Sequence, residues 1–232
     1  MKNICFIGAF EKLDLLLYLS KIITGLGKKV LIIDATQLQK ARYIVPTINP
    51  TKSYITRFEN VDIAIGFDSY EEIERYIGFT EEQKMKYDYA LVNIDDEEKF
   101  ENFNNQDTLK NYFVTSFELY SIRKGLETIR KINKPIKITK ILFSREINEN
   151  DNYYLDYLSL GYKIIWEENK INFPYETEDI EAMIENQKNS KISIKWLTQA
   201  YKESLEYLII DMIPDINITN LRRIMKNIER EG

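Results

Sequence analysis

The sequence predicts an α/β protein with a doubly wound, mostly parallel sheet of about seven strands and helices on both faces. Two observations lead to this prediction. Short apolar runs, typical of buried strands, alternate with amphipathic segments of helical period along the 232 residues. The first two runs also enclose one helical segment, and such a strand–helix–strand unit joins parallel strands by a right-handed crossover. This regular alternation is typical of doubly wound sheets.

The chain opens with this strand–helix–strand unit. Lys2–Gly8 is apolar and ends at a glycine, which predicts a buried strand. Apolar residues recur at helical spacing within Leu15–Leu26, and Gly25 and Gly27 end this helix. Lys29–Asp34 is the second predicted buried strand. The unit therefore requires a parallel sheet.

The next segment combines a loop, a strand and two helix starts. Ala41–Thr56 contains two prolines and is predicted to be a loop, and Val61–Phe67 is predicted to be a strand. Two capping boxes, in which Ser or Thr precedes Glu or Gln by three residues, predict helix N-termini. They pair Ser69 with Glu72, for a helix through Tyr76, and Thr80 with Gln83.

Strands and helices continue to alternate in the rest of the chain. The predicted strands are Tyr87–Ile94, Asn111–Thr115, Ile136–Phe143, Tyr162–Trp166 and Ile171–Phe173. The predicted helices are Glu118–Ile132, Tyr153–Leu160, Asp179–Asn186, Ile194–Met212 and Ile218–Ile228. The acidic stretch Asp95–Asp107 is predicted to be an exposed loop or a frayed helix. Because no repeat or linker interrupts the pattern, residues 1–213 form one predicted domain, followed by a C-terminal amphipathic helix in residues 214–232.

The composition excludes several classes of function. The chain has no histidine, which excludes His-based acid–base catalysis, Ser-His-Asp triads and His-ligated zinc. Its net charge of −5 argues against a general nucleic-acid binder, because phosphate contacts depend on basic residues. The single cysteine, Cys5, offers no disulfide framework, and no apolar run is long enough to span a bilayer. These features predict a cytoplasmic protein with Cys5 in its core.

Four segments carry a resemblance to a known family. Lys12 follows the first strand, the run Gly27–Asp34 follows the first helix, and Tyr87–Asn93 and Phe173–Glu176 come later. In this order and spacing they resemble the Walker A lysine, the second strand, the Walker B strand and the late I-P-Y-D segment of MinD/ParA proteins. These proteins are SIMIBI-class P-loop ATPases. The resemblance covers nearly the whole chain and implies a P-loop NTPase-like fold, with Asp34 at the position that helps to organise magnesium.

The phosphate-binding and magnesium-binding motifs of that family are degenerate in this chain. The loop Gly8–Glu11 is shorter than the family's loop, and Glu11 places a negative charge where phosphates would bind. Leu13 and Asp14 stand where a magnesium-binding threonine is expected.

Further departures affect the second half of the nucleotide site. Asn93 replaces the Walker B aspartate, Thr36 replaces a second aspartate, and Ser144-Arg145 stands in place of an adenine-contacting asparagine. The resemblance therefore implies a vestigial nucleotide site with no cofactor, no metal and no catalytic residue. Its members are Gly8, Glu11, Lys12, Asp14, Asp34 and Asn93.

Several of these residues also have a purely structural interpretation, which we favour. Lys12 is more simply a solvated lysine in a first helical turn than a phosphate ligand, and Asp34 is more simply the cap of the next turn. The run Asp95–Glu98 is more typical of a solvated loop than of a metal site. A rebuilt nucleotide site would instead use Lys12, Asp14, Asp34 and Asp95.

The C-terminal helix carries a candidate interaction surface. Its members are Leu221, Arg222, Ile224, Met225 and Ile228. In MinD the comparable helix lies on the membrane, so an interfacial helix at the inner face of the membrane is one interpretation. Docking on the domain or on a protein partner is the other. The stripe is short and lacks Phe and Trp, which favours docking.

The hypothesis that follows is a pseudo-ATPase, not an enzyme, that acts as a protein-interaction or positioning scaffold. The resemblance suggests a pilus, secretion or localisation system as its setting. The alternative is a weak ATPase or nucleotide-dependent switch of the MinD/ParA type. Protein partners are expected, a homodimer and peripheral membrane contact stay open, and the acidic charge disfavours nucleic acid.

Overall fold

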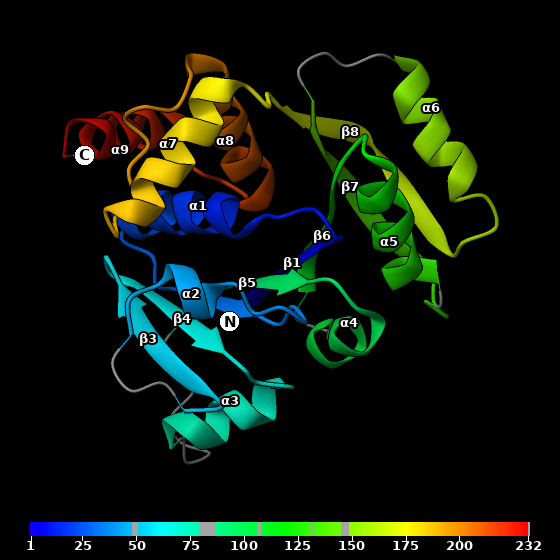
Figure 1. The fold of residues 1–232 in the computed structure, drawn as a ribbon, viewed down its shortest axis with the longest axis horizontal. Helices are drawn as coiled ribbons and strands as arrows, with labels where there is room; N and C mark the ends of the chain where they lie inside the picture. Colours follow the sequence, from blue (N-terminus) through cyan, green and yellow to red (C-terminus); the bar gives the residue numbers. More distant parts are fainter. Residues whose placement is uncertain (48–50, 79–86, 106–107, 131, 145–148, 232) are drawn as a thin grey trace.

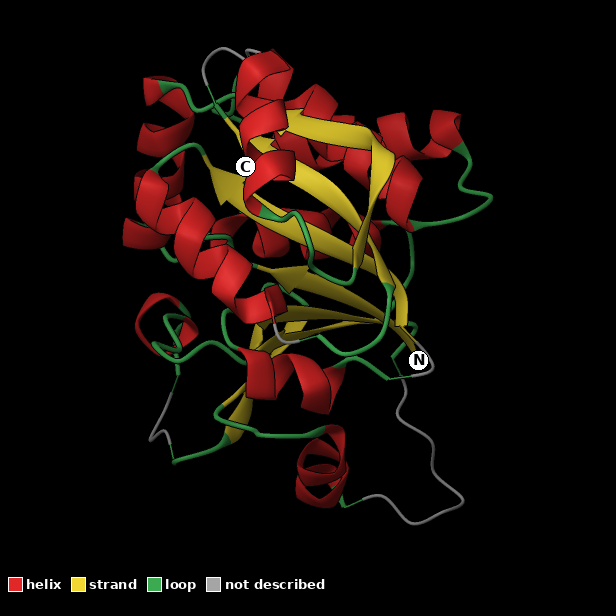
Figure 2. Cartoon of the chain, turned by 90° about the vertical axis from the view of Figure 1, so that its right-hand side faces the viewer, coloured by secondary structure: helices red, strands yellow, loops and turns green. Residues whose placement is uncertain are grey.

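The computed structural model describes residues 1–47, 51–78, 87–105, 108–130, 132–144 and 149–231. These residues form one eight-stranded sheet with helices on both faces (Figures 1 and 2). The strands, in chain order, are β1 Lys2–Ile7, β2 Val30–Asp34, β3 Tyr54–Phe58, β4 Val61–Ile65, β5 Tyr89–Ile94, β6 Thr108–Ser116, β7 Ile136–Phe143 and β8 Ile164–Phe173. The helices are α1 Leu13–Gly25, α2 Ala41–Ile44, α3 Tyr70–Ile77, α4 Glu97–Phe103, α5 Leu119–Arg130, α6 Glu149–Leu158, α7 Thr177–Lys188, α8 Gln199–Met212 and α9 Ile218–Glu231.

The strand order is β3-β4-β2-β5-β1-β6-β7-β8. Among the described strand pairs, only β3 with β4 is antiparallel, so the predicted mostly parallel, doubly wound sheet is confirmed. β1 lies between β5 and β6 at the centre of the sheet. Cys5 and Ile7 are fully buried there, as the apolar first run predicts. The chain order β1, α1, β2 therefore places the end of β1 at a point where the strand order reverses.

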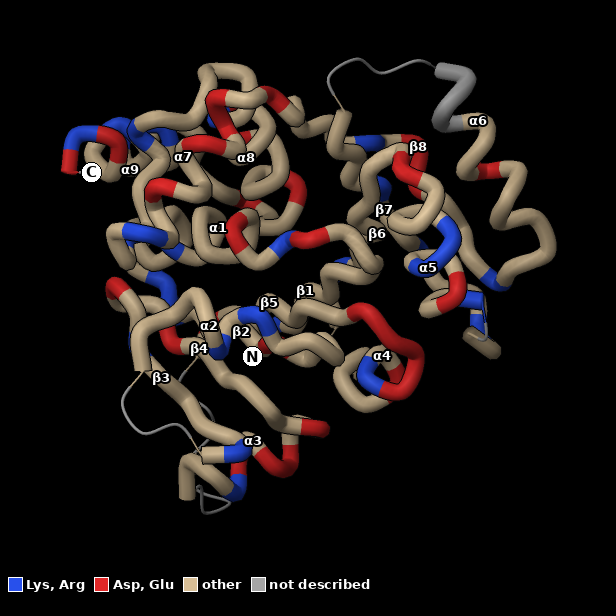
Figure 3. The backbone as a smooth tube through the Cα atoms, in the orientation of Figure 1, with Lys and Arg blue, Asp and Glu red and all other residues tan. Residues whose placement is uncertain are grey.

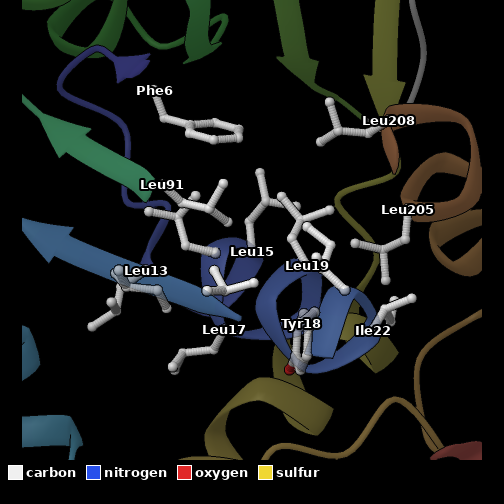
Figure 4. Packing of buried hydrophobic residues seen from close by; sticks show 14 of the residues in the cluster. Phe6, Leu13, Leu15, Leu17, Tyr18, Leu19, Ile22, Leu91, Leu205 and Leu208 are labelled. Atoms are coloured by element: carbon white, nitrogen blue, oxygen red, sulfur yellow. The ribbon is translucent and has the colours of Figure 1, made fainter. Parts of the chain in front are cut away.

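Each face of the sheet has its own apolar core. One core combines residues of β1 and β5 with residues of α1, α8 and α9, and the other combines residues of these strands with residues of α3, α4, α5 and α6. α1 is enclosed by the first core, which buries most of its side chains (Figure 4). Phe6 of β1, Leu91 of β5 and Leu205 of α8 surround its leucines. This burial explains why residues on nearly every side of α1 are apolar.

The C-terminal helix α9 is docked on this core. Leu221, Met225 and Ile228 of its apolar stripe are buried, and Ile224 is partly buried against the same cluster. A Cβ atom on Gly25 of α1 would lie 2.7 Å from Ile224 Cγ2, so the two helices approach closely at this glycine. The structure thus places the stripe inside the molecule, and contact of this stripe with a membrane would require α9 to separate from α1. None of the described helices is long and apolar enough to cross a bilayer.

The sequence prediction missed β3 and α2. Both lie in or next to Ala41–Thr56, where two prolines predicted a loop. β3 is joined to β4 by Glu59 and Asn60, whose φ angles of 45° and 67° form a two-residue hairpin turn. That turn lacks the Asn-Gly or Asp-Gly signal by which such hairpins are recognised. β3 is also an edge strand, with Arg57 exposed, so it has no clear apolar pattern.

Other boundaries differ in smaller ways. β8 is one strand where two short strands were predicted, because its polar middle lies on the edge of the sheet and needs no burial. α8 begins at Gln199, not at Ile194, because Thr198 caps it by accepting a hydrogen bond from the Tyr201 N–H. The Ser69 cap of α3 is confirmed. Within the acidic stretch that was predicted to be an exposed loop or a frayed helix, Glu97–Phe103 forms α4, and Phe100 and Phe103 are buried. The predicted Thr80–Gln83 capping box lies outside the described residues.

Candidate functional site

The candidate site lies at the carboxyl end of β1, where the loop Gly8–Glu11 leads into α1. Gly8 has a φ of 137°, and a Cβ atom there would lie 2.3 Å from the carbonyl oxygen of Val114 in β6. Only glycine therefore fits between β1 and its neighbour. In doubly wound sheets this edge, at a reversal of strand order, is where ligands bind. The position therefore makes the loop the first place to look for a ligand site.

Glu11 occupies the amide groups at the start of α1. Its Oε1 atom accepts hydrogen bonds from the N–H groups of Lys12 and Leu13, both at 3.0 Å. Its Oε2 atom lies 2.6 Å from Lys40 Nζ. Burial raises the pKa of Glu11, but the bonds from Lys40 and Leu13 outweigh it and hold that pKa below its usual value. A charged carboxylate of the chain itself thus lies where a helix N-terminus attracts anions.

Lys12 is buried, and its predicted solvated position is wrong. The residue is only 3% exposed because the loop folds over the start of α1. Its Nζ atom donates to the carbonyl oxygens of Gly8 at 2.7 Å and Phe10 at 3.4 Å. Burial lowers the pKa of its ammonium to about 8, against the raising effect of nearby carboxylates. Lys12 therefore holds its own loop closed.

Asp34 has the capping role that was predicted for it. Its Oδ1 atom accepts hydrogen bonds from the N–H of Thr36 at 3.3 Å and the hydroxyl of Thr36 at 2.6 Å. Its Oδ2 atom accepts a bond from the N–H of Ala41, the first residue of α2, at 3.0 Å. Burial raises the pKa of Asp34, and the Thr36 and Ala41 bonds act in the opposite direction. Both oxygens of Asp34 are thus engaged by the chain.

Asn93 lies beside Asp34 on the neighbouring strand β5. Its Nδ2 atom donates to Asp34 Oδ1 at 3.4 Å, and its own Oδ1 atom is buried without a hydrogen-bond partner among the described residues. A neutral side chain here avoids the repulsion that a second buried carboxylate would create next to Asp34. Asp95, just beyond β5, accepts the N–H of Gln37 at 3.0 Å.

Asp14 points away from the loop. Its Oδ2 atom accepts a hydrogen bond from Gln187 Nε2 of α7 at 2.9 Å. Burial raises the pKa of this carboxyl to about 6. Of the six residues assigned to the vestigial site, the structure therefore brings Gly8, Glu11, Lys12, Asp34 and Asn93 together and leaves Asp14 on another surface of α1.

The space left at the loop is small. The cavity beside Gly8–Lys12 measures about 60 Å³. Its remaining lining residues are Thr36, Leu38, Lys40, Asn93 and Asp95. Pockets for small molecules and cofactors typically measure about 300–1,000 Å³. The cavity is therefore too small for a nucleoside triphosphate unless the loop moves.

Two features of this site were not predicted from the sequence. Phe10 stacks on Phe143 at the end of β7, with ring centroids 4.7 Å apart, and its edge contacts Tyr175 at 5.7 Å. The ring thus packs against the end of β7 and the segment that follows β8. Ser144 follows Phe143 directly, and its neighbour Arg145 lies outside the described residues. The second feature is Lys40, which no motif marked as a partner of Glu11. Pairing of these residues depends on the path of the chain after β2, which local patterns do not specify.

Three solved structures have the same arrangement of strands and helices. A ParA family ATPase from Chlorobium tepidum matches with a TM-score of 0.53 and 13% identity, over 89% of this chain and 97% of that one. The fold is that of ParA and MinD. A chain of the MinC:MinD cell division complex of Aquifex aeolicus matches at 0.51 and 18% identity, over 94% and 99%. A plasmid partition protein from Borrelia burgdorferi, bound to AMPPNP, matches at 0.51 and 12% identity, over 97% and 98%.

The ParA/MinD fold extends over nearly the whole chain, although the sequences have diverged widely. No protein-family model and no curated protein matches the sequence. At these identities the ParA/MinD likeness describes the fold and leaves open what this chain does with it. The Gly8–Lys12 loop lies between β1 and α1, where the sequence predicts the counterpart of the Walker A loop.

Proposed function

We propose that this protein neither binds nor hydrolyses ATP at cellular concentrations and acts by binding other proteins. The observation that carries the proposal is the carboxylate of Glu11, bonded to the N–H groups of Lys12 and Leu13. These amides are the donors that a phosphate at the start of α1 would need. In this chain these N–H groups already donate to the Glu11 carboxylate. Because Glu11 is part of the chain, its local concentration is always high.

The energetic cost of displacing Glu11 supports the same proposal. Hydrogen bonds to charged groups contribute about 1.5–3 kcal/mol each, and the partial exposure of Glu11 places these two at the lower end. The exposed Lys40 pair adds about 0–1 kcal/mol. A cost of about 3 kcal/mol weakens phosphate binding roughly a hundredfold. Opening the cavity of about 60 Å³ would add to this cost.

For a chain with the ParA/MinD fold that does not bind ATP, we propose the binding of other proteins as its function. The Aquifex aeolicus structure is a complex of two cell division proteins, which supports protein partners for chains of this architecture. We propose a scaffold or positioning protein of the cytoplasm, in a pilus, secretion or localisation system. A second copy of the chain and the inner face of the membrane are further proposed contacts. A nucleic-acid partner is disfavoured by the net charge of −5.

A weak ATPase or nucleotide-dependent switch is the alternative. It is favoured by one observation: Asn93 has a buried oxygen without a hydrogen-bond partner among the described residues, next to Asp34 and near Lys12. A loop that opened on nucleotide would free Lys12 from Gly8 and expose these groups together. This alternative requires Glu11 to leave the start of α1.

Calorimetric titration with Mg-ATP and Mg-ADP separates the two functions. We expect no heat of binding at millimolar nucleotide and no release of phosphate. Lys12→Met, which keeps the buried stem and removes the ammonium, provides the matched variant, and its melting temperature reports whether it folds. Binding in the micromolar range that is lost in folded Lys12→Met would overturn the proposal and establish the switch.

A further inference from the structure

A groove lies on the outer side of α7, the yellow helix in front of α1 in Figure 1. It has a volume of about 630 Å³ and is bounded by one face of α7 and by the loop that leads to α8. Its lining residues are Glu178, Glu181, Ala182, Ile184, Glu185, Lys188 and Trp196. We call this surface the α7 groove. It is formed by residues other than those of the Glu11 site.

Trp196 is the principal apolar feature of the α7 groove. It is 68% exposed, and Ile184 beside it is 46% exposed. In the described residues its ring stacks on no other aromatic ring, and its cation–π contact is with Lys195 Nζ, 5.3 Å from the ring centroid. By contrast, Trp166 donates its N–H to Ser159 Oγ at 2.9 Å and packs on Phe113. Trp196 therefore contributes little to the core, and a partner that covered it would gain much apolar contact.

The rim of the α7 groove is acidic. Glu178 and Glu181 are exposed, and neither has an ion pair or a side-chain hydrogen bond in the described part of the chain. Glu185 pairs with Lys188 at 3.9 Å, on an exposed surface where such pairs are weak. The lining carries three glutamates and one lysine, and Lys195 beside Trp196 adds a second cation, so a small excess of negative charge remains along α7 (Figure 3). This excess disfavours nucleic-acid phosphates and anionic lipids. It attracts a basic ligand.

The loop that carries Trp196 is held at both ends by buried polar groups. Asn186 Nδ2 donates to the Ser193 carbonyl at 2.7 Å and to the Tyr18 hydroxyl at 3.0 Å. Asp179 accepts the N–H of Thr198 at 2.7 Å and its hydroxyl at 3.0 Å. Trp196 thus stands on a short segment fixed to α7 on either side. A surface that is already ordered loses less conformational entropy when a ligand binds.

We infer that the α7 groove binds a basic peptide segment of a partner protein. An aliphatic or aromatic side chain of the peptide covers Trp196 and Ile184, and Lys or Arg residues beside it pair with Glu178 and Glu181. The inference names the partner class for the protein-binding role proposed above and rests on that role. It is independent of the loss of nucleotide binding, because no residue of the groove belongs to the Glu11 site.

The test is selection from a random library of 12-residue peptides displayed on phage, with the whole chain as bait. The wild-type protein is expected to enrich peptides that combine Lys or Arg with an apolar residue. Synthetic versions of these peptides should shift the emission of Trp196 in a Trp166→Phe background, since that variant leaves one tryptophan. Enrichment of acidic or uncharged peptides, or of none, would overturn the inference.

Matched variants locate the binding. Glu178→Lys/Glu181→Lys and, separately, Trp196→Ala should weaken the selected peptides at least tenfold. The control for charge is Glu98→Lys/Glu101→Lys on α4, which changes the same two positions of a helix by the same charge. The control for aromatic loss is Tyr157→Ala, also 68% exposed. Equal binding by test and control variants would show that the peptides bind elsewhere.

The outcomes separate this inference from the proposed function. Peptide selection without the groove dependence would contradict the site but keep a protein-binding role. Groove binding together with micromolar Mg-ATP affinity would keep the site and contradict the pseudo-ATPase. Circular dichroism and melting curves of every variant show which of them are folded, so a misfolded variant does not enter the comparison.

Discussion

Glu11 acts on two parts of the structure at once, since it caps α1 and closes the site beside it. Sequence reasoning identified the charge of Glu11 as unfavourable for ATP, which depends only on residue type. It did not identify Lys40 as its partner or the N–H groups of Lys12 and Leu13 as its donors. The burial of Lys12 was likewise missed, because a lysine in a first helical turn is usually solvated. The direction in which each side chain points, not the residue type, determines the partners of Glu11 and the burial of Lys12.

Replacing Glu11 by alanine should destabilise the protein and uncover an anion site. Glu11→Ala removes both hydrogen bonds to the helix start and the Lys40 pair, so it should lower the free energy of unfolding in urea by about 1–3 kcal/mol, from the cost of a lost cap to the full loss of these bonds. Inorganic phosphate should then raise the melting temperature of the variant more than that of the wild type. Glu101→Ala, an exposed glutamate of α4, is the control. Unchanged stability and no response to phosphate would refute the capping role of Glu11.

Asp14 should make stability depend on pH. Burial raises its folded pKa to about 6, from an ordinary value of 3.8. For an acid with a raised pKa, the stabilising contribution is present below about pH 4 and is lost as the pH rises through 6. Asp14→Asn keeps an acceptor for Gln187 and removes the charge. It should be more stable than wild type by about 1–2 kcal/mol at pH 7.5, after allowance for partial solvent access.

The measurement for Asp14 is urea unfolding of both proteins across pH 4 to 8. The difference between them should shrink toward pH 4, because Asp14 is then protonated in the folded wild type and about half protonated in the unfolded wild type. A difference that is constant with pH would mean that the carboxyl titrates normally. Gln187→Ala in the same series tests whether the α7 contact matters.

At the scale of elements, α9 shows which features its sequence pattern predicted and which it did not. The amphipathic stripe Leu221–Ile228 predicted the helix and its apolar face correctly, because period alone determines both. What covers that face depends on distant segments, and the structure assigns it to α1 and α8. β3 was missed for a related reason, since an edge strand owes its pairing to β4 and has little pattern of its own.

The close approach of α1 and α9 at Gly25 predicts a specific coupling. Alanine favours helices over glycine by about 1 kcal/mol, so Gly25→Ala would stabilise α1 if α9 were loosely attached. Because the new Cβ would lie 2.7 Å from Ile224 Cγ2, we expect Gly25→Ala to destabilise the protein. Ile224→Ala should relieve the clash, giving a double-mutant coupling of about 1 kcal/mol in urea unfolding. A stabilising Gly25→Ala with additive effects would instead indicate that α9 is not docked there.

At the scale of the whole molecule, the fold was predictable because buried parallel strands and amphipathic helices have strong local patterns. The sheet, its central first strand and most helices followed from them. The closed state of the candidate site was only partly predictable. Substitutions such as Asn93 are visible in the sequence and indicate a changed nucleotide site. The stacking of Phe10 on Phe143 joins segments that are far apart in sequence, so it was not predicted.

The position of β1 at the centre of the sheet bears on the synthesis of the chain. β1 is synthesised before its neighbours β5 and β6, and the helices α8 and α9 that cover α1 are synthesised after them. The apolar sides of α1 therefore stay uncovered until residues 199–231 have been made. Domains with such long-range pairings fold slowly and are prone to aggregation while incomplete. Nascent chains that stall before α8 should thus bind chaperones strongly, and chains that include α8 and α9 should be released from them.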